Sequence, residues 1–514
     1  MMEEQFSNLS PLDSHGRGAD QPFSQFTEQR SQKFKSADEE DRFSPLPDSL
    51  IHHILSFLPS TKDAIQTCVL SKRWQHLWTH VPNLIFRYCE EHNPQFYESY
   101  GEFIVKTLSL YSSSKIRKFH LQLDSSHYYS LNSQIESWIL FVMRRDPEEL
   151  TLEFCSFEDY HVIFSDSDAY LLPKFFYSNN SLQELKTEFC DFLPEGRVDW
   201  RSLKVLHIGH AKFTDEVMKN ILSGSPLLES LKLKYCHGIH RLDIASKRMK
   251  KLVIYHILDL TGGQDDSALE IFSPHLEKLK ILGSWGKTKC KLMNVSSLVS
   301  AVLDFQLDNY ERVSNDFYQK YRNVVKELLE KIQHAKQLKI GTWCTEVLSI
   351  LEVKAMASPL STRKCLVLNF RYFKNWVFPG VANLLHNSPE LEKLVIKISY
   401  GRSLQFNFDE NFTNCYDIGE SYWTSQNKIF NCLLLNLKTI EIFSHEEHLF
   451  ENKYALAFVE FLLRNAKVLE KMAIFNDYPF HAPNKTDRLL KVAQKLLSVP
   501  RSSPHAVVLF PIPK

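Results

Sequence analysis

Two short segments carry residue types that bind phosphate or metal ions in other proteins. Residues 283–288, Gly-Ser-Trp-Gly-Lys-Thr, resemble the end of the phosphate-binding loop G-x-x-x-x-G-K-[ST], but that loop needs a glycine where Ile281 stands. Residues 445–448, His-Glu-Glu-His, place the histidines three apart, whereas the zinc motif H-E-x-x-H needs its second histidine where Leu449 stands. Because both segments fail the spacing that their chemistry requires, we predict neither a phosphate loop nor a metal site.

The other signatures of catalysis are equally missing. The sequence contains no G-x-G-x-x-G dinucleotide motif and no G-x-S-x-G nucleophile motif. Its ten cysteines are at least 17 residues apart, which excludes a C-x-x-C redox motif and a zinc ribbon. The 61 carboxylate residues are too many for a catalytic pair to be recognised or excluded by spacing. We therefore expect a non-catalytic protein without a cofactor.

Charge and length narrow the classes further. The 61 Lys and Arg residues balance 61 Asp and Glu residues, and a neutral chain is not typical of proteins that bind nucleic acid or membranes through a general basic excess. At roughly 150 residues per domain, 514 residues correspond to about three domains or one repeat array. The sequence has no run of 18 apolar residues and no signal-peptide pattern at its start. This favours a reducing location, the nucleus or the cytoplasm.

The first 41 residues are predicted to be disordered. They contain nine acids and four bases, and Leu9 and Leu12 are their only branched aliphatic residues. So little apolar surface cannot offset the entropy that is lost when a chain becomes ordered.

Residues 42–82 have a helical pattern instead. The apolar residues of the first predicted helix fall on two neighbouring sides: Leu50, Ile54 and Phe57 on one, and Ile51, Leu55 and Leu58 on the other. Pro47 suits its first turn, Pro59 closes it, and Ser60 or Thr61 and then Ser71 cap a second and a third helix. A bundle of this size cannot bury so broad an apolar band by itself, so we expect another protein or the next domain to cover the rest.

The phrases L-P-D-S-L-I-H-H-I-L-S-F-L-P and V-L-S-K-R-W-Q-H-L-W in this segment closely resemble the F-box of plant F-box proteins. The resemblance implies a module that docks a Skp-family adaptor and so links the chain to a cullin-RING ubiquitin ligase. The residues at the family's docking or supporting positions are Leu46, Pro47, Leu50, Ile51, Ile54, Leu58, Val69, Leu70 and Trp74. The alternative is that they form the core of the bundle; we expect partner contact for Leu46, Pro47 and Ile51, and core packing for Trp74.

A second phrase, L-x-x-L-x-[LI], recurs through the rest of the chain. Its second apolar position is occupied by Leu185, Leu206, Leu231, Leu252, Leu279, Leu394, Ile440 and Met472. The first four steps are 21, 25, 21 and 27 residues, inside the window of about 20 to 29 residues of leucine-rich repeats. Irregular copies are expected at Phe119, Leu150, Ala301, Leu338 and Leu366. We predict an α/β fold, in which residues 83–430 form an irregular leucine-rich-repeat solenoid with parallel strands on its concave face.

Each repeat should return through a helical segment on the outside of the solenoid. Helical apolar spacing marks such segments at Gln134–Arg144, Asp215–Leu222, Val324–Gln333 and Ala457–Arg464. Residues 402–427 are a long acidic and aromatic insertion, which is either a functional lid or a plain loop. Cysteines that follow three of the repeat strands, Cys155, Cys190 and Cys236, are predicted to be small buried side chains that face turn carbonyls.

The C-terminal part, residues 431–514, carries a further resemblance. C-L-L-L-N-L-K-T-I-E-I at 432–442 and F-V-E-F-L-L-R-N-A-K-V-L-E-K-M-A-I at 458–474 are similar to the FBD region that ends many plant F-box/leucine-rich-repeat proteins. That family usually has a glycine-containing loop between the two halves, and here F-S-H-E-E-H-L-F-E-N replaces it. The resemblance implies terminal repeats and a cap.

Lysines are the residues that could bind a partner on the strands. Because side chains alternate along a strand, Lys232 points away from the core when Leu231 and Leu233 point into it. The same register exposes Lys118, Lys186, Lys251, Lys278, Lys280, Lys339, Lys393, Lys397 and Lys471, opposed mainly by Glu184, Glu188 and Glu441. One interpretation is a merely solvated face. The other is a surface for acidic or phosphorylated client segments, with Lys232, Lys278, Lys280 and Lys393 as the client-binding residues.

Together these features predict a substrate-recognition subunit of an SCF-type ubiquitin ligase, in which the F-box binds the Skp adaptor and the repeats bind a client protein. One alternative is a Skp-binding scaffold that supports no ubiquitination. Another is a small-molecule receptor whose repeat pocket would use Trp285, Trp343 or Trp376.

Overall fold

The computed structural model describes residues 45–87, 94–124, 128–154, 169–257, 268–285, 289–306, 315–371, 375–398, 418, 422–425, 428–444, 453–476, 490 and 493–511. These residues form two compact units: the first lies within residues 1–82 and adds 111–113, and the second contains 83–110 and 114–514. The predicted tail, 1–41, lies outside the described residues, as do Cys155, residues 445–448 and most of the insertion 402–427.

The first unit consists of short helices. They are α1 (Asp48–Leu55), α2 (Thr61–Gln66), η2 (Thr67–Val69), η3 (Lys72–Gln75) and η4 (Leu77–His80). Pro47 precedes α1 in an extended conformation, and the Ser60 side chain accepts a hydrogen bond from the Asp63 N–H at 3.1 Å, as its capping role predicts. The predicted third helix is instead two 3-10 helices, η3 and η4, which meet at His76, and the Ser71 side chain makes no capping hydrogen bond.

One apolar cluster holds the first unit together. It contains Ile51, Leu55, Trp74, Leu77 and Val81, and Leu46 and Leu58 pack partly against it. The Arg73 guanidinium donates to Asp48 at 3.1 Å, which ties η3 to the start of α1. The start of α1 is therefore tied to η3 by a surface ion pair, and its buried side packs in the cluster.

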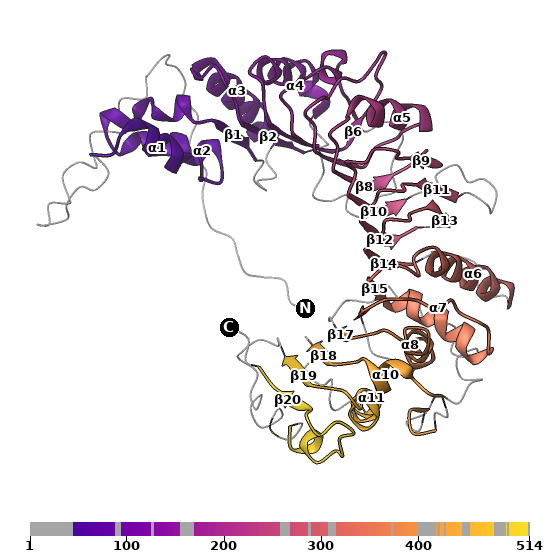
Figure 1. Cartoon of the computed structure of the whole chain (residues 1–514). Helices are drawn as coiled ribbons and strands as arrows, with labels where there is room; N and C mark the ends of the chain where they lie inside the picture. The colour runs from indigo at the N-terminus through magenta and orange to yellow at the C-terminus, as the bar shows by residue number, and fades with distance from the viewer. Residues whose placement is uncertain are drawn as a thin grey trace, which may run out of the picture. The chain divides into compact units, whose positions relative to one another are not determined.

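The second unit is built on a sheet of 15 parallel strands (Figure 1), which confirms the predicted α/β solenoid. In spatial order the strands are β1 (Asn83–Phe86), β2 (Lys118–Leu123), β3 (Glu149–Phe154), β5 (Glu184–Glu188), β7 (Val205–Gly209), β8 (Ser230–Cys236), β10 (Lys251–Ile257), β12 (Lys278–Ser284), β14 (Ser300–Gln306), β15 (Gln337–Gly341), β16 (Cys365–Phe370), β17 (Lys393–Ile398), β18 (Thr439–Ser444), β19 (Lys471–Asn476) and β20 (Val507–Leu509).

The pairing register follows the repeat phrase. Leu231 pairs with Leu206 on one side and with Leu252 on the other, and the row continues from Leu84 to Val508. All five irregular copies lie in this row: Phe119, Leu150, Ala301, Leu338 and Leu366. The side chains of these five residues are at most 2% exposed, so they belong to the core that neighbouring repeats share.

The helices of this unit lie on the outer side of the curved sheet (Figure 1). They are α3 (Pro94–Leu110), α4 (Tyr128–Met143), α5 (Asp215–Gly224), α6 (Asn315–Lys331), α7 (Thr342–Val353), α8 (Val377–His386), α10 (Asn431–Leu435) and α11 (Lys453–Asn465). The four predicted helical segments are confirmed as parts of α4, α5, α6 and α11. Helix α7 had no amphipathic signal because every residue from Thr342 to Leu351 is buried.

The outer segments of the middle repeats differ from the expected helices. There β9 (Arg241–Asp243), β11 (Ala268–Phe272) and β13 (Lys289–Asn294) form a second parallel sheet. Leu269 and Ile271 are buried and alternate with exposed or half-buried neighbours, which is the burial pattern of a strand. A smaller pair, β4 (Tyr170–Leu171) with β6 (Cys190–Asp191), forms a separate two-stranded sheet in an earlier repeat.

Candidate partner-binding surfaces

Helix α1 has an apolar ridge that its own unit does not cover. Ile51 and Leu55 point into the core and are 0% and 3% exposed, whereas Leu50 and Ile54 point outward and are 48% and 40% exposed. Phe57, one turn further, is 74% exposed. The two apolar sides that the sequence pattern predicted therefore differ: one is core and the other is open surface.

A second apolar pair lies at the end of the α2 segment. Val69 and Leu70 are 79% and 63% exposed, although both are large aliphatic residues. Exposed aliphatic side chains in one small unit are typical of a protein-binding surface. We call Leu50, Ile54, Phe57, Val69 and Leu70 the exposed ridge.

The predicted adaptor-binding residues thus divide into three groups. Pro47, Leu50, Ile54, Val69 and Leu70 are exposed, and Leu46 and Leu58 are half-buried. Ile51 and Trp74 are 0% and 6% exposed and belong to the core cluster. Direct partner contact by Ile51 is therefore wrong for this structure; its side chain supports α1 from below, and the expected core packing of Trp74 is confirmed.

The face of the long sheet opposite its helices carries the predicted lysines. Lys232 and Lys280 lie on either side of Val253, in the row next to the buried leucines. Lys251 and Lys278 pair with each other at the start of β10 and β12. Since neighbouring strands are about 4.8 Å apart, these four ammonium groups share one small area. We call Lys232, Lys251, Lys278 and Lys280 the basic band.

A histidine beside the band has a pKa shift that is consistent with positive charge there. The pKa of His207, on the neighbouring strand β7, is lowered to about 4 by burial and then by Lys232, Lys186 and Lys251. Among the residues that the structure describes, none of the four band lysines forms an ion pair. Their charge is thus available to a partner.

Lys393 does not belong to this band. It lies on β17, four strands beyond β12, and its ammonium group is 2.7 Å from the Glu441 carboxylate. Lys186 is likewise 2.5 Å from Glu184. The expectation that Lys393 joins Lys232, Lys278 and Lys280 in one unopposed stripe is therefore wrong, because its own neighbouring strand supplies a counterion.

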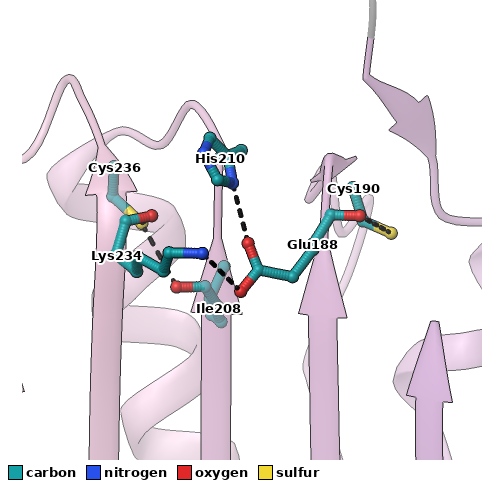
Figure 2. A network of polar contacts seen from close by, with 6 residues as sticks. All are labelled: Glu188, Cys190, Ile208, His210, Lys234 and Cys236. Carbon is teal, nitrogen blue, oxygen red and sulfur yellow. Dashed lines mark hydrogen bonds and ion pairs between the residues drawn. The ribbon is translucent and has the colours of Figure 1, made fainter. Parts of the chain in front are cut away.

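A polar network lies beside the basic band, on the side of strand β5 (Figure 2). The Glu188 carboxylate lies across Gly209 and reaches His210 Nδ1 at 2.7 Å and Lys234 Nζ at 3.4 Å. A Cβ atom at position 209 would lie 2.0 Å from a Glu188 oxygen, so only glycine leaves room for this crossing. Lys234 is consequently neutralised, unlike Lys232 two residues earlier.

Cys190 and Cys236, the two described cysteines of the predicted group, are buried and face backbone carbonyls as predicted. Cys190 Sγ lies 3.7 Å from the Glu188 carbonyl oxygen, and Cys236 Sγ lies 3.6 Å from that of Ile208 (Figure 2). Burial raises the pKa of Cys236 to about 12 and raises that of Cys190 as well. Both thiols are structural at neutral pH.

The residues whose types suggested chemistry form no catalytic arrangement in the described part of the chain. Ile281 is buried within β12, so the backbone ring of a phosphate loop has no place there. Trp285, Trp343 and Trp376 are at most 6% exposed and pack in the core, so they line no open pocket. Among the described residues, no three His, Cys, Asp or Glu side chains are grouped as metal ligands would be.

No described helix is both long and apolar enough to span a membrane.

Comparisons with known proteins agree with this arrangement of two units. The F-box domain family matches residues 43–86, and the family described as At1g61320/AtMIF1, LRR domain, matches residues 107–474. The putative F-box/LRR-repeat protein At3g18150 of Arabidopsis thaliana is 32% identical over 84% of this chain and 86% of its own length. F-box/LRR-repeat protein At5g02910 of the same plant is 34% identical over 85% of this chain and 89% of its own length.

The repeat family covers well over half of the chain, and the relatives are similar across both units. Proteins of this kind are generally non-catalytic, and an F-box generally serves substrate recognition by binding a Skp-family adaptor. The chain belongs to the plant F-box/LRR-repeat proteins.

Proposed function

We propose that this protein is a substrate-recognition subunit of an SCF-type ubiquitin ligase. The observation that carries the proposal is the exposed ridge of the first unit, where five large apolar side chains are between 40% and 79% exposed. A surface of this kind is favourable only when a partner covers it, and a Skp-family adaptor is the partner that an F-box implies. The ubiquitin chemistry then belongs to the other subunits, and this chain supplies binding.

We further propose that the basic band binds the client protein through an acidic or phosphorylated segment. Lys251, Lys278 and Lys280 are exposed, Lys232 is half-buried, and none of them has a carboxylate partner among the described residues. A phosphate group brings about −1.5 to −2 charges at pH 7, which suits four ammonium groups on neighbouring strands. Lys393 is left out of this surface because Glu441 neutralises it.

Two finer assignments complete the proposal. Residues 432–474 act as an FBD-like end of the repeat array, which is consistent with β18, α11 and β19 continuing the sheet and its outer helices. The protein works in the nucleus or the cytoplasm, where cullin-RING ligases and unpaired cysteines are both expected.

Co-purification tests the ligase role. The tagged full chain should retain a Skp-family adaptor together with a cullin, and the double variant Leu50→Ala/Ile54→Ala should lose both, since truncating side chains at an interface centre costs about 2 kcal/mol or more. Leu193→Ala is a matched control, because Leu193 is 59% exposed in the second unit. Adaptor without cullin would indicate a scaffold instead of a ligase subunit, and undiminished adaptor binding by the double variant would contradict the ridge.

A further inference from the structure

Five neighbouring repeats share an unusual backbone conformation at the carboxyl end of their strands. The residues that follow the paired positions Glu188, Gly209, Lys234, Tyr255 and Leu282 all have positive φ. They are Phe189 (59°), His210 (51°), Tyr235 (51°), His256 (51°) and Gly283 (80°). Side chains other than glycine rarely adopt this conformation, so four aromatic residues in one row require an explanation.

The conformation stacks the four rings. Successive ring centroids along Phe189, His210, Tyr235 and His256 are 4.2, 4.7 and 4.4 Å apart, and the interplanar angles are 7°, 16° and 12°. The stack ends on Gly283, where a Cβ atom would lie 2.4 Å from the His256 ring. Polar contacts fix two of the rings, since Glu188 holds His210 and the Ser284 N–H donates to His256 Nδ1 at 2.8 Å. Stacking thus orients all four rings, and polar contacts hold two of them as well.

One part of the stack borders the basic band. Tyr255 lies on β10 two residues beyond Val253, the residue that Lys232 and Lys280 flank. Its ring meets those of Tyr235 and His256 edge-on, at 5.9 and 4.6 Å. Tyr235, Tyr255 and His256 are each half-buried, in contrast to the fully buried aromatic residues of the core. We call these three residues the aromatic shelf.

We propose that the aromatic shelf binds an aromatic side chain of the client, placed two residues from the acidic or phosphorylated residue that the basic band binds. This inference rests on the proposed client-binding role of the band. Residues i and i+2 of an extended segment point to the same side and are about 6.6 Å apart, which matches the two-residue step from Val253 to Tyr255. Half-exposed aromatic rings beside cations without an ion pair favour a flat partner group, because ring pairs gain from stacked or edge-on contact.

Peptide binding tests the proposal without knowledge of the client. The probes are fluorescent Gly-Ser peptides with one phosphoserine followed two residues later by tyrosine, leucine or glycine, titrated against the full chain by fluorescence anisotropy. We expect the tyrosine peptide to bind about three- to tenfold more tightly than the glycine peptide, with leucine between them. Tyr255→Leu should abolish that preference and Tyr255→Phe should retain it.

Control variants separate recognition from a purely structural role of the stack. Phe443 stacks on Phe475 at 4.4 Å on strands β18 and β19 of the same sheet, so Phe443→Leu removes a comparable ring away from the basic band and should leave the tyrosine preference unchanged. Lys232→Glu/Lys280→Glu should weaken all phosphopeptides by the same factor.

The outcomes distinguish the shelf from the band. If tyrosine and glycine phosphopeptides bind the wild type equally well and an unphosphorylated peptide binds more weakly, the shelf is refuted and the band stands. If phosphorylation does not strengthen binding, both proposals are refuted. An equal loss of tyrosine preference in Phe443→Leu and Tyr255→Leu would assign the effect to sheet stability and would also refute the shelf.

Discussion

Neighbouring residues on one strand of the long sheet have opposite environments. On β8, Leu231 is fully buried in the row that runs through all 15 strands, whereas Lys232 lies half-buried on the other face. Burial of the leucine side chain stabilises the array through transfer from water and close packing. The lysine side chain contributes charge to the basic band and little to the core.

Leu231→Ala should therefore lower the free energy of unfolding by about 2 to 5 kcal/mol, because it leaves a cavity between two neighbouring repeats. Lys232→Ala should change it by no more than about 0.5 kcal/mol. Urea unfolding followed by circular dichroism measures both values. Equal losses would mean that the two side chains do not point to opposite faces.

Gly209→Ala should displace the Glu188 carboxylate and break its contacts with His210 and Lys234, since the new Cβ atom would lie 2.0 Å from a carboxylate oxygen. We expect a loss of about 1 kcal/mol, because these contacts are charge-assisted but partly open to water. Gly196→Ala is the control, as no heavy atom lies within 4 Å of the place that its new methyl group would take. Comparable unfolding midpoints for the two variants would contradict the crossing.

His207 should make stability depend on pH. Its pKa is about 4 in the folded protein and about 6.5 in the unfolded chain, so the unfolded state binds the proton more strongly. The histidine thus costs no stability above pH 6.5 and progressively more as the pH falls toward 4. The urea midpoint of the wild type should drop relative to that of His207→Gln over this range, and a constant difference would contradict the shift.

At the scale of single elements, the two sides of α1 perform different tasks. Ile51→Ala should destabilise the first unit by about 2 to 5 kcal/mol, because Ile51 is completely buried among Leu55, Trp74 and Val81. Leu50→Ala, one residue earlier, should leave the thermal unfolding of that unit unchanged and weaken adaptor binding. Differential scanning calorimetry combined with an adaptor titration measures both effects; reversed behaviour would mean that α1 is rotated about its axis.

The sequence predicted the strands of the second unit better than the segments between them. A strand needs only an alternating pair of buried residues, and this signal persisted even where Ala301 replaces a leucine. The outer segments gave weaker signals for two reasons. Helix α7 is buried on all sides and so lacks the polar face that marks an amphipathic helix. Strand β11 alternates buried and exposed residues like the inner strands, so helical spacing could not identify it.

The candidate site could be predicted only in part for a related reason. Strand alternation placed Lys232, Lys278 and Lys280 on the correct face. Alternation says nothing about which strand supplies a counterion, however, and Lys393 meets Glu441 only because β17 and β18 are neighbours. The positive φ of Tyr235 had no sequence signal, since tyrosine is not among the residue types enriched in that conformation.

At the scale of the whole molecule, charge is distributed unevenly although the net charge is zero. Four lysines without an ion pair among the described residues, Lys232, Lys251, Lys278 and Lys280, lie together on β8, β10 and β12, whereas Lys118, Lys186 and Lys393 are each paired with a glutamate. Charges within about 8 to 10 Å of each other act together at physiological ionic strength. A neutral protein can therefore attract an acidic segment to one place.

Reversal of the band is the decisive test of this distribution. Lys232→Glu/Lys278→Glu/Lys280→Glu should abolish client capture from cells treated with a proteasome inhibitor, while adaptor binding by the first unit stays intact. The wild type should lose client as salt rises from low to physiological concentration, because screening weakens the attraction, and the reversed protein should show no such dependence. Lys393→Glu is the matched control, because it inserts the same charge on the same face of the sheet but four strands away from β12. Its new carboxylate would lie opposite Glu441, so the variant should lose some stability. It should still capture the client. Client capture that survives the triple reversal with unchanged salt dependence would place recognition outside the basic band.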